Sequence, residues 1–341
     1  MTQTQNSDNV QGKDNKLLDI FKFIAAILIL ASHCLPLIPN ENFNFFYGQW
    51  FFRFCVPLFL ISSGFFFASF NRSRKIKYIK RIAILYFFST LLYMPIYLRQ
   101  GPSVIIRNSL LGYHHLWYLS ALLISLIFCF FLEETFCGRL FNKLYPLLII
   151  PLILIGAFFD EYQYVFTELK DMHFVAFIRY IIRMIGGHRH ALFFAFPEIL
   201  IGKFLYDHKR KINPSSITCV VLTALSLLLS LAECFMLRYF GGNLITCDIT
   251  LFNYLPAVFL FLLTLSSRPK GLSAINTRTI RKISDIVYIS HVLVILIIDQ
   301  LLGVTYITRL VLVILLSVCT ACVYVKIERI IIKRCQTRNY L

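Results

Sequence analysis

Ten long apolar runs alternate with short polar segments along the 341-residue chain. A helix of roughly 16 to 22 residues, rising about 1.5 Å per residue, approximates the ~30 Å hydrocarbon core of a bilayer. The pattern therefore predicts an all-α, polytopic membrane bundle of about ten transmembrane helices. The runs lie near residues 17–38, 50–70, 79–98, 116–132, 144–159, 191–206, 217–238, 250–267, 283–301 and 307–326.

One further apolar stretch, "FVAFIRYIIRMI" at 174–185, differs from these runs. It carries Arg179 and Arg183 four residues apart, on one face of a helix. This pattern is typical of an amphipathic helix that lies in the membrane interface rather than crossing the bilayer.

Composition supports the membrane prediction. Hydrophobic residues make up 58% of the chain and the mean hydropathy is +0.72, whereas soluble domains are about half apolar. The formal net charge of +17 could indicate nucleic-acid binding. However, the basic residues cluster between apolar runs, as the positive-inside rule requires of a multi-pass protein of the cell membrane. We therefore expect membrane lipid, and no nucleic acid, as a partner.

The basic clusters also predict the orientation. Segment 72–81 holds six Lys or Arg, and further clusters follow the sixth, eighth and tenth runs, whereas 39–49 and 299–306 hold none. With ten spans, both termini are cytoplasmic. We expect a cytoplasmic tail at 1–16, which lacks the layout of a signal peptide, a transmembrane domain at 17–326 and a basic cytoplasmic tail at 327–341.

The ten cysteines are scattered, mostly within apolar runs, where a free thiol behaves as a small hydrophobe. Cys319 and Cys322 form a C-x-x-C, but no βαβ pattern surrounds them, which argues against a redox site. No zinc-type spacing is present, so we expect no metal.

The first run, "DIFKFIAAILILASHCL" at 19–35, contains Lys22 and His33. Their separation of 11 residues turns a helix by about 1100°, within about 20° of three full turns. Both side chains thus share one face, about 16 Å apart, and predict a polar path through the bundle. The alternative is that Lys22 extends to the headgroups, with Asp19 as its local ion-pair partner, while His33 sits at the interface.

Histidine and arginine recur at the predicted outer ends of other runs, which indicates a shared site at one membrane level. Interfacial arginines and aromatic belts are the alternative explanation. The residues are Arg53 in the second run, His114, His115 and Trp117 in the fourth, and His188, Arg189 and His190 in the sixth, with Glu198 deeper.

These stretches resemble acyltransferase family 3, a family of integral-membrane acyltransferases. The family signature of Arg or Lys, ten residues and then His is matched by Lys22 and His33. Glu198 stands where the family usually has an apolar residue, and Val292 where it has proline. The other matching motifs are Arg53 with "VPLFLISSG" at 56–64, "HLWYL" at 115–119, the stretch 189–202 led by Arg189, and "IRKISDIVYISHV" at 280–292, which contains His291.

The resemblance implies a membrane O-acyltransferase. The donor would be acetyl-CoA or another acyl-CoA from the cytoplasm, and the acceptor a hydroxyl of an extracytoplasmic envelope glycan or lipid-linked sugar. Imidazole can accept a hydroxyl proton at neutral pH, so His33 is the predicted general base. The other candidates are Lys22 for donor binding, Arg53 and Arg189 for stabilising the oxyanion or orienting the acceptor, His115 and Trp117 for the acceptor pocket, and Glu198 and His291 as substrate-binding residues without a specific role.

An alternative comes from a second resemblance, to the membrane portion of vancomycin-resistance serine racemases, which is thought to supply an amino acid across the membrane. The chain ends fifteen residues after the tenth run, so we expect no racemase domain. Transporters are often built from inverted repeats, and no convincing internal repeat is evident in this sequence.

The orientation can be tested with reporters that are active on one side of the membrane only. A fusion after Arg81 or at Leu341 should report cytoplasm, and a fusion within 39–49 should report the outside. An outside signal from Leu341 would contradict the count of ten spans, and the stretch 174–185 would then be the first segment to re-examine.

Overall fold

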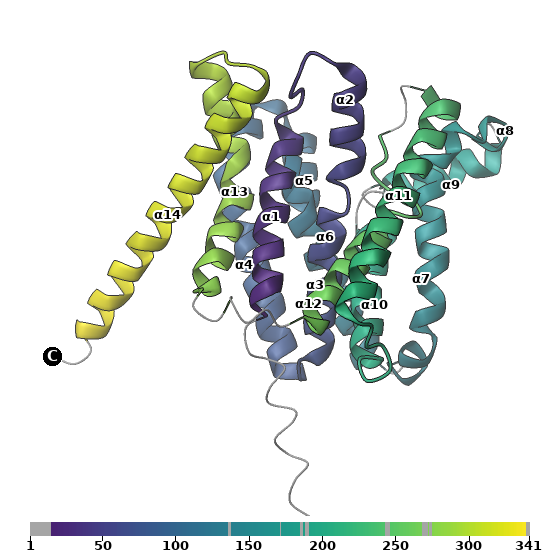
Figure 1. Cartoon of the computed structure of the whole chain (residues 1–341), viewed down its shortest axis with the longest axis horizontal. Coiled ribbons are helices and arrows are strands. Elements are labelled where there is room, and N and C mark those ends of the chain that lie inside the picture. Colours follow the sequence, from purple (N-terminus) through teal and green to yellow (C-terminus); the bar gives the residue numbers. More distant parts are fainter. Residues whose placement is uncertain are drawn as a thin grey trace, which may run out of the picture. The chain divides into compact units, whose positions relative to one another are not determined.

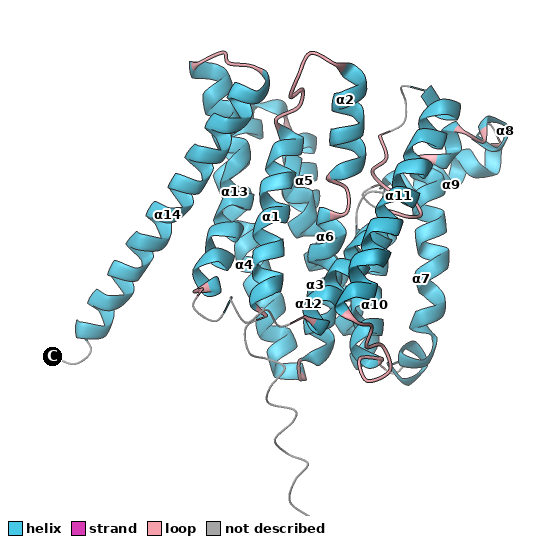
Figure 2. Cartoon of the chain, in the orientation of Figure 1, coloured by secondary structure: helices cyan, strands magenta, loops and turns pink. Residues whose placement is uncertain are grey.

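The computed structural model describes residues 15–135, 138–170, 172–184, 187, 191–242, 246–267, 272 and 275–338. Within these ranges every regular element is a helix and no strand occurs (Figure 2). The predicted all-α class is therefore confirmed. The chain divides into two compact units, 1–39 with 263–341, and 40–262.

The first unit contains α1 (Lys16–His33), α13 (Thr277–Leu301) and α14 (Tyr306–Arg338) (Figure 1). The Asn15 side chain starts α1, because its oxygen accepts from the Leu18 amide at 3.1 Å and its amide group donates to the Thr264 carbonyl at 2.9 Å. Apolar residues on facing sides of the three helices form one core, which includes Leu30, Val287, Ile295 and Val313.

The second unit holds the remaining helices, and its boundary with the first falls within α12. In chain order these are α2 (Glu41–Phe46), η1 (Tyr47–Phe51), α3 (Cys55–Ser69), α4 (Arg72–Tyr97), η2 (Leu98–Gln100), α5 (Pro102–Leu111), η3 (His114–Leu116), α6 (Trp117–Glu134), α7 (Gly138–Asp160), η4 (Tyr162–Tyr164), α8 (Thr167–Lys170), α9 (His173–Met184), η5 (Ala191–Ala195), α10 (Phe196–Asp207), α11 (Ser216–Gly241) and α12 (Tyr254–Ser266).

Helices α3 and α10 pack with their backbones in direct contact. A Cβ atom at Gly64 would lie 2.2 Å from the Ile199 carbonyl oxygen, and one at Gly202 would lie 2.1 Å from the Ile61 carbonyl oxygen. Small residues allow this approach in membrane bundles, where close packing replaces the hydrophobic effect between helices. The two glycines end the motifs at 56–64 and 189–202, so one function of those motifs is to join α3 to α10.

Seven described helices are long and apolar enough to cross a membrane. The other three predicted runs correspond to α1, to η5 with α10, and to α12. A multi-pass helical protein is therefore confirmed, while the count of ten and the side of the termini stay predictions. The seven spans are Glu41–Ser69, Arg72–Gln100, His114–Glu134, Gly138–Asp160, Ser216–Gly241, Thr277–Leu301 and Tyr306–Ile331.

The eighth predicted run, 250–267, is helical only from Tyr254. Residues 246–253 are not helical, and Cys247, Ile249, Thr250 and Asn253 among them are buried. The helix predicted for this run is therefore shorter than expected, because residues 250–253 are not part of it. Buried apolar side chains have the same hydropathy in irregular backbone as in a helix, which explains the error.

The predicted amphipathic helix is present as α9, at His173–Met184. Phe174, Phe177 and Tyr180 are exposed on it, while Ile182 packs into a small core with Phe159. The helix is confirmed, and its location at a membrane interface stays a prediction.

The contact between α3 and α10 predicts that Gly202→Val disrupts the second unit. The new side chain would meet the Ile61 carbonyl, and overpacking typically costs about 1–3 kcal/mol, with the upper end expected where the neighbour is backbone. We expect loss of the monodisperse peak in detergent or a large fall in apparent Tm. The control is Ala224→Val on an exposed face of α11, which should behave as wild type; a Gly202→Val protein with wild-type Tm would refute the close contact.

Candidate functional site

Lys22 and His33 lie on the single helix α1, with His33 as its last residue. Both side chains are half-buried. Because the helix is continuous between them, the spacing puts both on one face, as expected from the sequence. The α1 face of Lys22 and His33 is the first part of the candidate site.

His33 meets His291, a residue of α13 that the sequence marked without a specific role. The ring centroids are 5.2 Å apart and the ring planes are inclined by 38°. The His291 side chain is buried, and its Nδ1 lies 2.7 Å from the Tyr288 carbonyl oxygen. A carbonyl can only accept a hydrogen bond, so Nδ1 carries the proton and Nε2 carries the lone pair. Two of the predicted site residues are thus adjacent.

A second set of polar contacts links the other end of α1 to α13. The Asp19 carboxylate accepts two hydrogen bonds from Arg281, at 2.9 and 2.8 Å, and Asp19 is only 4% exposed. The Ser284 hydroxyl donates to the Lys22 carbonyl at 3.4 Å. Along α1, residues 19, 22 and 33 contact residues 281, 284 and 291 of α13 in that order. The two helices therefore run parallel.

Three charged side chains act on Lys22. Asp285 has the largest electrostatic effect, followed by Asp19 and Arg281. The local pair with Asp19 expected from the sequence is therefore only part of the arrangement, because both Asp19 oxygens also bind Arg281. Sequence analysis missed Asp285. Its position four residues after Arg281, on one face of α13, is the signal that could have found it.

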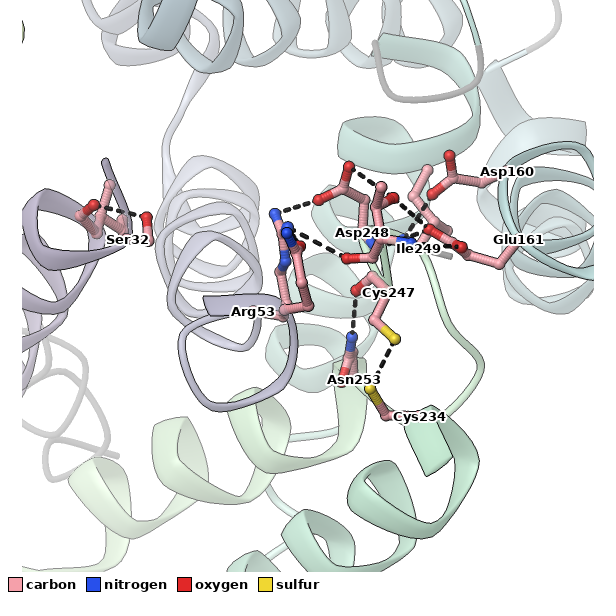
Figure 3. Close-up of polar contacts among 12 residues, drawn as sticks. Ser32, Arg53, Asp160, Glu161, Cys234, Cys247, Asp248, Ile249 and Asn253 are labelled. Carbon is pink, nitrogen blue, oxygen red and sulfur yellow. Dashed lines mark hydrogen bonds and ion pairs between the residues drawn. The ribbon is translucent and has the colours of Figure 1, made fainter. Parts of the chain in front are cut away.

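Arg53 lies in the second unit, in the turn between η1 and α3, and its guanidinium group is held on two sides (Figure 3). It forms an ion pair with Asp248 and a hydrogen bond with Gln49, and it donates to the Thr246 carbonyl at 3.2 Å. The buried Nε of Arg53 has no hydrogen-bond partner among the described residues.

Asp248 belongs to the non-helical segment 246–253, and three buried carboxylates hold the backbone of this segment. Buried peptide N–H groups must find partners, and bonds to charged acceptors are the stronger ones. The segment can thus present Asp248 to Arg53 in a fixed position. Glu161 accepts from the amides of Thr246 and Asp248, both at 3.0 Å; Asp160 accepts from Ile249 at 2.8 Å; and Glu233 accepts from Leu251 at 2.6 Å and Phe252 at 2.9 Å.

Glu161 lies just beyond the end of α7, and its carboxyl group has a perturbed pKa. Burial, and next the charge of neighbouring Asp160, raises the pKa of Glu161 from 4.5 to about 7. The hydrogen bonds from Thr246 and Asp248 favour the ionised form and oppose this shift. The carboxyl group therefore changes charge near neutral pH.

His115 and Trp117 make the contacts of packed aromatic residues. The buried His115 ring meets the edge of Tyr93, with centroids 5.0 Å apart and planes at 71°. Trp117 packs against Phe194 at a centroid distance of 5.5 Å. Arg189, the remaining arginine of the predicted site, lies outside the described residues.

Glu198 is fully buried in α10, within the core of the second unit. Neither of its carboxylate oxygens, nor the nearby buried hydroxyl of Tyr254, has a hydrogen-bond partner among the described residues. The charge of Glu198 acts on Tyr254. A buried carboxyl group without a partner is costly, so its presence at a position where the family usually has an apolar residue is unexplained by packing.

The Glu161 pKa predicts a pH-dependent stability. The folded-state value, about 7, lies above the ordinary 4.5. Its stabilising contribution, on the order of 2–3 kcal/mol, is complete below about pH 4.5 and is lost as the pH rises through about 7. The apparent Tm of the wild type should fall between about pH 4.5 and pH 7, the interval between the unfolded and folded pKa values, and level off above it, and Glu161→Gln should flatten this slope.

The matched control is Glu168→Gln on α8, because Glu168 is exposed. This variant should keep the wild-type slope. An unchanged slope in Glu161→Gln would mean that another group causes the pH dependence.

The chain matches known proteins over most of its length. The model of a family described as "Acyltransferase domain" matches residues 15–326. An amino-acid racemase of Enterococcus faecalis is 30% identical over 203 residues, which are 56% of this chain and 28% of the relative. A second amino-acid racemase of that organism is 25% identical over 304 residues, covering 83% and 41%. A serine/alanine racemase of Enterococcus gallinarum is 27% identical over 276 residues, covering 74% and 37%.

The chain thus spans less than half the length of these curated relatives. No solved structure matches it. The family match, in contrast, covers all of the motifs discussed above, the whole of unit 40–262 and most of the other unit. We conclude that the chain is a multi-pass membrane protein that belongs to acyltransferase family 3.

Proposed function

We propose that this protein is a membrane O-acyltransferase that moves an acyl group, acetyl in the simplest case, from acyl-CoA on the cytoplasmic side to a hydroxyl of an extracytoplasmic envelope glycan or lipid-linked sugar. The observation that carries this proposal is the pairing of His33 with His291 on the helical face that also bears Lys22. The proposed base, His33, and the proposed donor-binding cation, Lys22, then lie at different positions along the same helix, α1.

In this mechanism His33 is the general base. It accepts the proton of the acceptor hydroxyl while the hydroxyl oxygen attacks the thioester carbonyl carbon. The tetrahedral intermediate then collapses, the carbon–sulfur bond breaks, and the CoA sulfur leaves and receives a proton. His291, whose Nδ1 proton is committed to the Tyr288 carbonyl, keeps its ring fixed beside His33. We assign His291 as a positioning residue rather than as a second base.

Lys22 is the proposed donor-binding residue, for the phosphates or the polar arm of the acyl-CoA. Asp285 and Asp19 both act on Lys22, and Asp19 also binds Arg281, so two acids face two bases at this end of α1. An anionic donor would be attracted by Lys22 in competition with these two carboxylates.

Arg53 is the proposed oxyanion or acceptor ligand. Fixed donors in a water-excluded site stabilise the developing negative charge of a tetrahedral intermediate. The ion pair with Asp248 fixes the guanidinium group, and its buried Nε lacks a partner among the described residues. Arg189, His115, Trp117 and Glu198 remain proposed acceptor-side residues. The ring contacts of His115 and Trp117 support a packing function for these two rather than a reactive one.

A transport function is the second candidate, and the racemase names of the curated relatives favour it. In that case the membrane portion would supply an amino acid to the other side without a thioester. Incubating the purified protein with radiolabelled acetyl-CoA separates the two functions. Acyl transfer predicts donor hydrolysis and label in envelope polysaccharide, whereas transport predicts neither, and instead uptake of labelled serine or alanine by proteoliposomes.

Substitutions on the α1 face should separate chemistry from donor binding. His33→Ala should lower transfer by about 10² to 10⁴, the usual contribution of general-base assistance, with normal expression and insertion. Lys22→Ala should raise the apparent KM for acyl-CoA more than it lowers turnover, and Lys22→Arg should be mild because it keeps the charge.

The matched histidine control is His208→Ala. His208 packs on Phe204 in the second unit, outside the proposed machinery, and this variant should retain full transfer. A well-folded His33→Ala protein with wild-type transfer would refute the mechanism and make transport the leading candidate.

A further inference from the structure

Two cysteines meet beside the non-helical segment 246–253. Cys234 lies on α11 and Cys247 lies in the segment, and their Sγ atoms are 2.7 Å apart (Figure 3). Both side chains are buried, at 1% and 0% exposure. From the sequence, the scattered cysteines are expected to behave as small hydrophobic residues. This pair is different, because each sulfur has the other as its neighbour.

The position of Cys247 is set by contacts that do not involve its sulfur. The Asn253 amide group donates to the Cys247 carbonyl at 3.1 Å, and the Ser230 hydroxyl on α11 donates to the Asn253 side-chain oxygen at 2.6 Å. On either side of Cys247, Glu161 holds the amides of Thr246 and Asp248. The approach of the two sulfurs is therefore a consequence of how the segment is fixed to α11.

Charge within the same unit indicates the compartment. The segment follows the end of α11 at Gly241, whereas Lys209, Arg210 and Lys211 precede the start of α11 at Ser216. The two ends of a spanning helix lie on opposite sides, and clustered basic residues favour the cytoplasmic side. The pair is then near the extracytoplasmic end of α11, where disulfides form and persist.

We propose that Cys234 and Cys247 form a disulfide bond that closes segment 246–253 onto α11 and thereby secures the position of Asp248 against Arg53. Two S–H bonds break and one S–S bond forms. Two electrons and the two thiol protons pass to the disulfide of an extracytoplasmic thiol–disulfide oxidoreductase, which becomes a dithiol. The inference does not depend on the acyl-transfer proposal.

The bond has to form before the segment closes. Thiol–disulfide exchange requires an accessible thiolate, and both sulfurs are buried in the folded chain. The hydrogen bond between the two thiols, together with burial, raises the pKa of Cys247, which makes a reduced, folded pair unreactive. Oxidation during membrane insertion and folding avoids this barrier.

Differential alkylation of the wild-type protein tests the bond directly. Membranes are quenched in acid, denatured and treated with N-ethylmaleimide; the protein is then reduced, treated with isotopically heavy N-ethylmaleimide and mapped by mass spectrometry. We expect the heavy label on Cys234 and Cys247, and the light label on Cys129, a buried cysteine of α6. Light label on both Cys234 and Cys247 would overturn the proposal.

A thermal measurement tests the consequence. A disulfide stabilises a fold mainly because it restricts the unfolded chain. Reducing the Cys234–Cys247 bond should therefore lower the apparent Tm of the wild type by roughly 5 °C. Cys234→Ser and Cys247→Ser should start at the lower Tm and not respond to reductant, whereas Cys129→Ser should respond as the wild type does. A wild-type Tm that stays unchanged after complete reduction, verified by loss of the heavy label, would show that the pair has no structural function.

Discussion

The second unit depends on one constraint: a peptide N–H group buried away from water must find a partner inside the protein. Helices meet this requirement internally, but segment 246–253 is not helical and half of its residues are buried. Asp160, Glu161 and Glu233 supply the missing acceptors. The bonds between these acids and the segment fix Asp248, and Asp248 fixes Arg53. The position of the Arg53 guanidinium group thus depends on the hydrogen bonds that hold the backbone of segment 246–253.

In the first unit it is polar side chains, rather than backbone N–H groups, that need partners inside the protein. Between α1 and α13, Asp19 binds Arg281, and the His291 ring is anchored to a backbone carbonyl before it meets His33. Because these groups occur in a fixed order along both helices, they define the register in a way that leucine and isoleucine contacts alone would not. Apolar side chains tolerate sliding and repacking, whereas a paired polar group that slips by one turn becomes unsatisfied.

The sequence predicted the features that depend on local spacing. Apolar runs gave the helical class, and the separation of Lys22 and His33 predicted their common helix and face. The partners came only with the structure, because His33 and His291 are far apart in the chain and no period connects them. Asp160, Glu161 and Glu233 were equally hidden: acids at the ends of apolar runs look like ordinary boundary residues, and their partners are backbone amides, which have no sequence signature. The count of spans depends on the length of the apolar runs, and the orientation depends on that count together with the charge clusters.

The family motifs can be divided by what their residues do. Gly64 and Gly202 bring the backbones of α3 and α10 together, and His115 and Trp117 pack against other aromatic rings. His291 and Arg53 are instead held in place by polar contacts, and the His33 ring lies beside that of His291. Fixing groups in advance is how a protein prepares them for chemistry at low entropic cost. Glu198 fits neither class, because it departs from the family pattern and lies without a hydrogen-bond partner among the described residues in the middle of an apolar core. A buried carboxyl group of this kind is costly in a membrane helix. Glu198 is therefore the residue of these motifs whose presence the packing of the fold does not explain.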